Sequence, residues 1–160
     1  MKHFKTNLAV AVGMAMATMA PATAGANTGT DMVSYYTAGT YEQTTNTDGG
    51  LTAAASGTGD CRAACAAAPA AGAFTISLTV TKAHPPSPCR FLQATGTLQA
   101  TWSDSTSSAA SISAHWLDHQ AIRINGTVTS GTYQGRSISA LFHPPSPCSG
   151  PFTGTLSFSG

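Results

Sequence analysis

Charged residues are scarce in this chain of 160 residues, which has seven Lys or Arg and six Asp or Glu, with Glu42 as the only glutamate. Nucleic acids and anionic membranes are bound through clustered Lys and Arg, and the sequence shows no such cluster. We therefore expect no nucleic-acid partner. About a quarter of the residues are Ser or Thr, so hydroxyl groups must hydrate much of the surface.

The sequence motifs of several enzyme classes are also missing. There is no G-x-S-x-G, no H-E-x-x-H and no Gly-rich phosphate loop. The aspartates are scattered, and no spacing pairs two carboxylates for glycoside hydrolysis. His115, Asp118 and His119 lie close together in a serine-rich chain, but no nucleophile motif accompanies them. We predict no catalytic residues and no cofactor.

A single long apolar run is present, and it stands near the start of the chain. Residues 8–20 are apolar, Lys2 and Lys5 precede them, and small residues follow, with cleavage sites after Ala24 or Ala26. About 13 residues are too few for a membrane span, which needs about 20, so this pattern predicts an export signal. We expect the mature protein to be soluble, without a membrane span, and secreted or periplasmic.

This signal divides the chain into two predicted parts, a cleaved segment 1–26 and a single β-domain 27–160. The second part has five basic and six acidic residues, a net charge of about −1 with the histidines neutral. Its charge therefore favours neither nucleic acid nor an anionic membrane.

Four cysteines, Cys61, Cys65, Cys89 and Cys148, indicate two disulfides in an exported chain, because their spacing lacks the paired knuckles of a zinc site. A short helix over 61–68, capped by Asp60, would place Cys61 and Cys65 on one face. We therefore predict that these two pair with Cys89 and Cys148, in an order left open. The alternative pairing is Cys89–Cys148 with Cys61–Cys65.

Apolar and polar residues alternate over 74–82, 95–103 and 152–159, which predicts half-buried antiparallel strands. Residues 109–117 fit a strand better than a short helix. The fold class predicted from this alternation is all-β, either a two-layer antiparallel sandwich or a small barrel of about seven or eight strands, with one short disulfide-stapled helix.

The dipeptide Asn125-Gly126 is typical of a tight hairpin, but a turn there would mix the two faces of the strand. A strand that continues through it aligns Ile122, Ile124 and Val128 instead. We therefore predict the turn at Ser130-Gly131, followed by a bulge at Gly135.

The hexapeptide HPPSPC occurs twice, at 84–89 and 143–148, and a G-T-L segment follows each copy. A G-T-Y segment also precedes each copy. A duplication would give half-repeats of about 31–104 and 120–160, with an insert of about 42–73 in the first. The alternative is that one turn solution is used twice.

Proline fixes φ and removes an amide donor, so each hexapeptide must end a strand and leave it as a stiff segment with a cysteine anchor. That stiffness serves folding alone or presentation to a partner. The candidate partner-binding residues are His84, Pro85, Pro86, Ser87, His143, Pro144, Pro145 and Ser146. His84 and His143 are also the only candidate metal ligands by their equivalent positions, but no further ligand is evident, and we predict no metal site.

Aromatic residues offer a sugar-binding platform or a core, and Trp102 and Trp116 lie on the apolar faces of their strands, which favours the core. The function we predict is an exported, non-catalytic binding or structural domain that presents the two loops to an unknown extracellular protein or glycan. One alternative is a secreted protease inhibitor with a cysteine-tethered loop. Another is a metal-binding protein or a hydrolase that uses the loop histidines.

Overall fold

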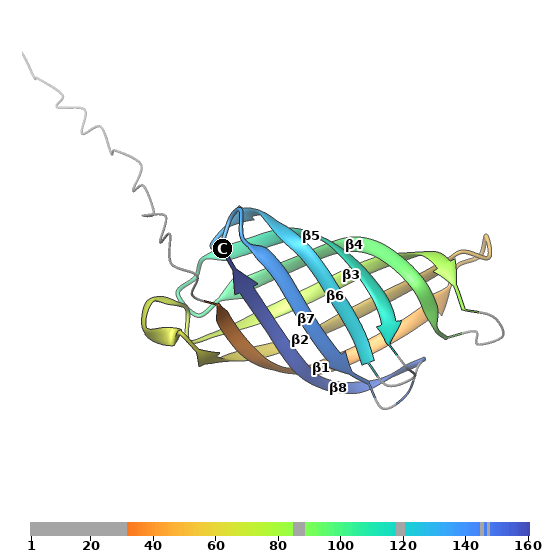
Figure 1. The fold of residues 1–160 in the computed structure, drawn as a ribbon. Helices are drawn as coiled ribbons and strands as arrows, with labels where there is room; N and C mark the ends of the chain where they lie inside the picture. The colour runs from red at the N-terminus through yellow and green to blue at the C-terminus, as the bar shows by residue number, and fades with distance from the viewer. Residues whose placement is uncertain (1–31, 85–88, 118–120, 145, 147) are drawn as a thin grey trace, which may run out of the picture.

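The computed structural model describes residues 32–84, 89–117, 121–144, 146 and 148–160. Within these residues eight antiparallel strands close into a barrel, in the order of the sequence (Figure 1). The strands are β1 (Val33–Thr45), β2 (Leu51–Ala63), β3 (Ala71–Ala83), β4 (Phe91–Trp102), β5 (Ser107–Leu117), β6 (Ala121–Gly131), β7 (Ser137–His143) and β8 (Ser149–Ser159). The all-β prediction is confirmed, in its barrel form.

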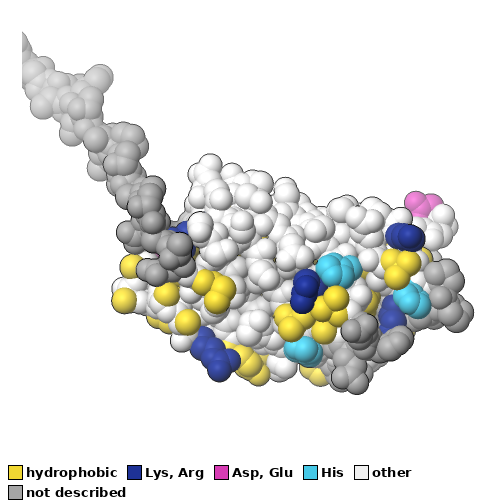
Figure 2. All heavy atoms as spheres, viewed as in Figure 1, with side chains coloured by type: hydrophobic (Ala, Val, Ile, Leu, Met, Phe, Trp, Pro, Cys, Tyr) yellow, Lys and Arg dark blue, Asp and Glu magenta, His cyan; other side chains and the backbone are white. Residues whose placement is uncertain are grey.

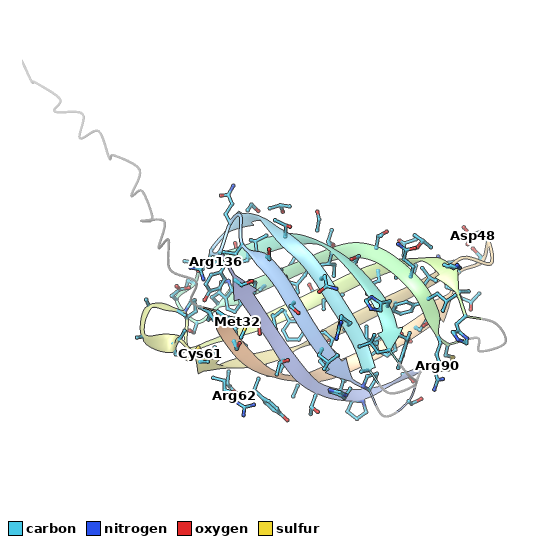
Figure 3. All side chains as sticks on the ribbon, viewed as in Figure 1. Met32, Asp48, Cys61, Arg62, Arg90 and Arg136 are labelled. Atoms are coloured by element: carbon cyan, nitrogen blue, oxygen red, sulfur yellow. A yellow bond between two sulfur atoms is a disulfide. The ribbon has the colours of Figure 1, made fainter. Side chains whose placement is uncertain are left out.

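The barrel closes where β1 pairs with β8, and each other strand pairs with its neighbours in sequence. With an even number of strands, β1 begins and β8 ends at the same end of the barrel, which we call the terminal end. The opposite end, which we call the loop end, carries the connections β1–β2, β3–β4, β5–β6 and β7–β8. Figure 3 labels Met32, Cys61 and Arg136 at the terminal end, and Asp48 and Arg90 at the loop end.

The predicted alternation places apolar side chains inside the barrel and hydroxyl groups outside. In β3, Phe74, Ile76 and Leu78 are buried, while Thr75 and Thr79 are exposed. The same pattern holds in β4 and β8, and residues 109–117 form most of strand β5 rather than a helix. The strands predicted from period-two alternation are therefore confirmed.

Strand β6 runs through Asn125-Gly126 without turning, as predicted. The turn lies slightly later than predicted, over residues 132–135, because β6 extends to Gly131. The bulge at Gly135 is confirmed. The N–H of Gly135 donates to the Val128 carbonyl at 2.9 Å, the N–H of Val128 donates to the Arg136 carbonyl at 2.9 Å, and Gly135 has a φ of 83°.

The helix predicted over 61–68 is wrong. Asp60 and Cys61 belong to β2, and the only helical piece among the described residues is the 3-10 turn Cys65–Ala67. The segment predicted as an insert, 42–73, therefore contains a complete strand of the barrel. The proposed duplication and its boundaries stay a prediction.

Large side chains fill the barrel interior in three aromatic clusters. Tyr35, Trp102, Tyr133 and Phe158 lie near the terminal end, Phe74, Phe142 and Phe152 in the middle, and Tyr41, Phe91 and Trp116 near the loop end. Burying one such apolar side chain stabilises the fold by about 1.5–3 kcal/mol.

Glycines make the middle of the barrel compact. Gly39 and Gly57 are cross-strand partners in β1 and β2, and a Cβ on either would collide with the backbone of the other strand. On its other side, Gly39 pairs with Phe152 of β8, and Gly57 pairs with Phe74 of β3. The ring centroids of these two phenylalanines lie 6.3 Å apart. Small residues and large rings thus alternate around the interior, as the taper of a small barrel requires.

Candidate functional site

The two HPPSPC copies occupy corresponding connections at the loop end, since 84–89 joins β3 to β4 and 143–148 joins β7 to β8. The structure describes His84 and Cys89 in the first copy, and His143, Pro144, Ser146 and Cys148 in the second. The other candidate loop residues, Pro85, Pro86, Ser87 and Pro145, lie outside the described residues.

A disulfide joins the two loops directly. Cys89 is bonded to Cys148, with 4.7 Å between their Cα atoms, and Cys61 is bonded to Cys65 at the terminal end, with 5.8 Å between theirs. The predicted pairing of Cys61 and Cys65 with the loop cysteines is therefore wrong, and the alternative pairing is the one observed. The physical reason is that β2 carries Cys61 to the end of the barrel opposite the loops.

The two equivalent histidines have different surroundings. His84 is half-buried, its backbone N–H donates to the Arg90 carbonyl at 3.1 Å, and its Nδ1 atom is buried without a hydrogen-bond partner among the described residues. His143 is exposed at the end of β7. The same letter of the repeat therefore closes a hairpin in one copy and faces solvent in the other.

The second loop is also held to β1. The backbone N–H of Gln43 donates to the Cys148 carbonyl at 2.7 Å, and the Tyr41 hydroxyl donates to Gln43 Oε1 at 3.0 Å. Burial raises the pKa of Tyr41 above its usual value, and the indole of Trp116 opposes that shift. Pro144 is buried and Ser146 is half-buried, so this loop lies against the barrel.

The side chain of Arg90 lies over the aromatic cluster at the loop end. The guanidinium carbon of Arg90 lies 5.8 Å from the centre of the Trp116 ring. Trp116 in turn meets Tyr41 and Phe91 edge-on, with centroids 6.2 and 6.4 Å away. The Trp116 Nε1 atom is buried and makes no hydrogen bond of normal geometry. The aromatic cluster at the loop end therefore contains a buried polar atom that has no hydrogen bond of normal geometry among the described residues.

The described residues contain no group of three His, Cys, Asp or Glu side chains placed to hold a metal ion. Asp118 and His119 lie outside the described residues, while His115 is half-buried on β5. Asp104 is exposed between β4 and β5, where both the hydroxyl and the N–H of Thr106 donate to it and lower the pKa of its carboxyl group. Its interactions are those of a turn.

The aromatic side chains form a core rather than a sugar platform. Tyr35, Tyr41 and Trp102 are buried, and Trp116 and Tyr133 pack against the core. Among the described tyrosines and tryptophans, Tyr36 alone is exposed, at 48%. The prediction that Trp102 and Trp116 belong to the core is confirmed.

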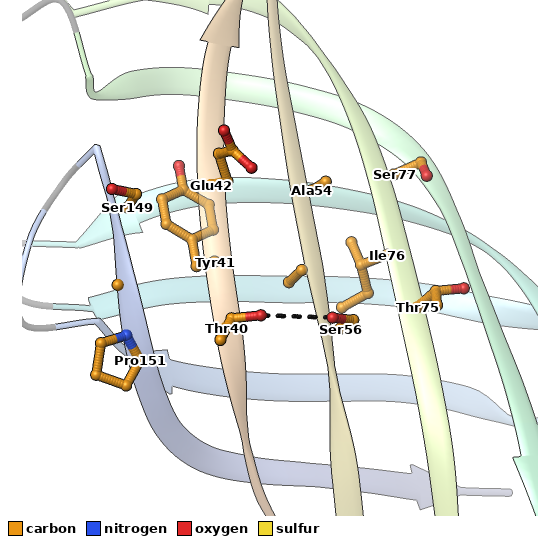
Figure 4. A pocket seen from close by; sticks show the side chains of 12 residues that line it. Thr40, Tyr41, Glu42, Ala54, Ser56, Thr75, Ile76, Ser77, Ser149 and Pro151 are labelled. Atoms are coloured by element: carbon orange, nitrogen blue, oxygen red, sulfur yellow. Dashed lines mark hydrogen bonds between the residues drawn. The ribbon is translucent and has the colours of Figure 1, made fainter.

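Sequence reasoning missed an open groove on the outer face of β8, β1, β2 and β3, with a volume of about 690 Å³ (Figure 4). Its charged side chain is Glu42, and its other polar groups are hydroxyls, including Thr40 and Ser56 at 3.5 Å from each other. Detecting this groove from the sequence required predicting strand β2. Its many Ala and Gly residues give little difference in hydrophobicity between its two faces.

The protein is therefore a closed, eight-stranded up-and-down barrel with a filled interior. A disulfide links its two repeated loops at one end. No family model, curated protein or solved structure matches the chain. No helix among the described residues has the length and apolarity needed to cross a bilayer.

Proposed function

We propose that this chain is an exported, secreted or periplasmic, non-catalytic domain that binds an extracellular protein or glycan through its two linked loops. The observation that carries the proposal is the Cys89–Cys148 bond, which joins two identical hexapeptides at one end of a filled barrel. Two stiff segments fixed to one another lose little conformational freedom on binding, which favours affinity.

Three further features support the proposal. Large side chains occupy the interior, so a partner must bind to the outside. Two disulfides fit an oxidising compartment outside the cytoplasm. Finally, proline is sufficient to end a strand and cysteine to cross-link two loops, and neither role needs the same His and Ser in both copies.

The test is a variant in which the four repeated polar side chains are replaced by alanine, H84A/S87A/H143A/S146A. We expect its melting temperature to stay within a few degrees of the parent, because His143 is exposed, His84 and Ser146 are only half-buried, and substitutions outside the core usually change stability by about 0.5 kcal/mol or less. We expect it to lose the proteins or glycans that the parent captures from the extracellular fraction of the producing cells.

A control variant places four alanines on exposed positions of the terminal end, R62A/T101A/Q134A/S137A. It should capture the same partners as the parent. Equal capture by both variants would refute the loop proposal, and a large loss of stability in the loop variant alone would show that these side chains fasten the loops internally.

A secreted protease inhibitor is the second candidate, favoured by the covalent anchor that Cys89 and Cys148 provide at the end of both loops. Inhibitors of this kind hold a rigid loop against an active site, although three prolines per loop leave few N–H groups for the enzyme to bind. Incubation with serine, cysteine, aspartic and metallo-proteases tests this candidate, and residual activity in every case would exclude it for those classes.

A further inference from the structure

A row of outward-facing side chains crosses the barrel near the loop end. Lys82 of β3 pairs with Gln93 of β4, and the pairing of β4 with β5 brings Gln93 beside His115. His115 pairs with Arg123 of β6, and Arg123 pairs with Leu141 of β7. Successive strands lie about 4.8 Å apart, so Lys82 and Arg123 stand about 14 Å from each other along this row.

Apolar side chains lie among these cations. Leu92 is 42% exposed, and it lines a shallow hollow of about 400 Å³ together with Lys82 and His115. Leu141 is half-buried on the outer face at the other end of the row. Figure 2 shows blue and cyan side chains beside yellow ones toward the loop end, and a second group of yellow and blue side chains toward the terminal end. We call Lys82, Leu92, His115, Arg123 and Leu141 the cationic face.

Of the four acidic residues that the structure describes, two lie toward the loop end and two at the terminal end. They are Glu42 on β1, Asp48 between β1 and β2, Asp60 on β2 and Asp104 at the terminal end. Among the described residues, neither Lys82 nor Arg123 forms an ion pair. Asp118, in the connection from β5 to β6, lies outside the described residues. Asp48 lies at the same end of the barrel as Lys82, but its carboxylate accepts the N–H of Gly50 at 3.0 Å, so the two cations of the row are left to attract an acidic partner.

We propose that the cationic face docks an acidic, leucine-bearing segment of another protein. Four residues of an extended chain span about 13 Å, so two carboxylates four residues apart match the separation of Lys82 and Arg123. Leu92 and Leu141 offer contacts for apolar side chains of the same segment. A glycan is less well matched, because the aromatic rings near this end, Tyr41, Phe91 and Trp116, belong to the interior cluster.

This inference goes beyond the proposed function, because the row lies on the strands and does not use the loops' proline or serine residues. The loop variant H84A/S87A/H143A/S146A separates the two. If it keeps the acidic peptide described below while losing its captured partners, the loops and the cationic face are independent surfaces. If the peptide binds to neither the parent nor this variant, the cationic face fails and the loop proposal stands unaffected.

The experiment uses the purified protein and a fluorescein-labelled peptide that has two glutamates four residues apart, a leucine midway, and serine and glycine elsewhere. Fluorescence anisotropy should show binding, and the peptide with glutamine in place of glutamate should bind about tenfold more weakly. Raising the NaCl concentration from about 0.1 M to about 1 M shortens the Debye length from about 10 to about 3 Å, so it should weaken binding as well.

Two single substitutions provide the matched comparison. Arg123→Gln should weaken binding about threefold to fivefold, whereas Arg62→Gln, which removes the same charge from the terminal end, should leave it unchanged. The double variant K82Q/R123Q should reach about tenfold, with a melting temperature close to that of the parent.

Equal binding of the Glu and Gln peptides, or equal losses in R123Q and R62Q, would overturn the proposal. Tighter binding to heparin, or to vesicles of equal parts phosphatidylcholine and phosphatidylglycerol, that is lost in K82Q/R123Q would also overturn it. In that case the face would recognise polyanionic glycans or anionic lipids instead of an acidic polypeptide.

Discussion

The two ends of the barrel treat their buried polar groups differently. At the terminal end, the Tyr35 hydroxyl bonds to the Tyr133 hydroxyl at 2.6 Å and donates to the Pro69 carbonyl at 3.0 Å. The Trp102 indole donates to Ser108 Oγ at 2.8 Å. These aromatic polar atoms therefore have partners, and the cluster closes the terminal end as a satisfied part of the core.

At the loop end, Trp116 Nε1 and His84 Nδ1 are buried without a hydrogen bond of normal geometry. Leaving such a group unpaired costs about 1–3 kcal/mol. Such atoms are not confined to the loop end, because Thr37 Oγ1 on β1 is also buried without a partner among the described residues. The difference between the two ends therefore concerns their tryptophans: the indole N–H of Trp102 has a hydrogen-bond partner, and that of Trp116 has none of normal geometry among the described residues.

The largest expected difference between the ends concerns their tryptophans. Trp102→Ala should destabilise the protein by about 3–5 kcal/mol, because Trp102 is 5% exposed and contacts three other aromatic rings. Trp116→Ala should cost about 2 kcal/mol or less, because Trp116 is only half-buried and its N–H is not satisfied. Denaturant unfolding followed by circular dichroism measures both values. Equal losses would remove the distinction between the two ends.

For the disulfides, we expect the larger loss of stability at the loop end rather than at the terminal end. The Cys89–Cys148 bond spans 59 residues and the Cys61–Cys65 bond spans 4. Loop entropy then predicts a loss of about 4 kcal/mol for C89A/C148A and about 2 kcal/mol for C61A/C65A. Unfolding in guanidinium chloride measures each loss, and peptide mapping without reduction verifies the pairing. A linkage between Cys61 and Cys89 would contradict the observed fold of β2.

The smallest expected difference between the two ends concerns how the free energy of unfolding depends on alkaline pH. Burial is the main cause that raises the pKa of Tyr35 and Tyr133 at the terminal end and of Tyr41 at the loop end. A folded tyrosine with a raised pKa keeps its proton after the unfolded chain loses it near pH 10. Stability is therefore fully present below about pH 10 and falls above it, by up to about 1.4 kcal/mol per pH unit for each such tyrosine.

Unfolding free energies measured at pH values above and below 10 check this dependence. Tyr35→Phe and Tyr41→Phe should each make the decline shallower, and Tyr36→Phe, at an exposed position, is the control. A decline of the same steepness in all three variants would show that the buried tyrosines do not cause it.

Sequence alone predicted several strands in which large inner residues alternate regularly with polar ones, such as β3, but it did not predict β1 or β2. Phe74, Ile76 and Leu78 contrast with the threonines between them, and this contrast is what period-two reasoning detects. Strand β2 was missed because Ala53, Ala55 and Gly57 occupy its inner positions. These residues are small because aromatic rings from neighbouring strands fill the space, which is a property of the closed barrel and not of the local sequence.

The same error determined the wrong disulfide pairing. A helix over 61–68 would place Cys61 and Cys65 on one face, from which they were predicted to pair with the loop cysteines, whereas β2 carries Cys61 to the terminal end. The position of the candidate loops at strand connections was predictable, because three prolines within four residues remove the N–H donors that a strand ladder needs. The cationic face was not, because Lys82, His115 and Arg123 come together only through the register of four strands.

Because β1 pairs with β8, the chain could begin and end at another connection between strands without loss of a strand pairing. Val33 pairs with Phe158, so a short linker between the two could join the first strand to the last at the terminal end. New termini could then open in the exposed turn at 103–106, and all eight ladders would remain hydrogen-bonded. A circularly permuted chain of this kind would present the linked loops unchanged at the opposite end, which allows the barrel to be fused or immobilised from several positions without covering them.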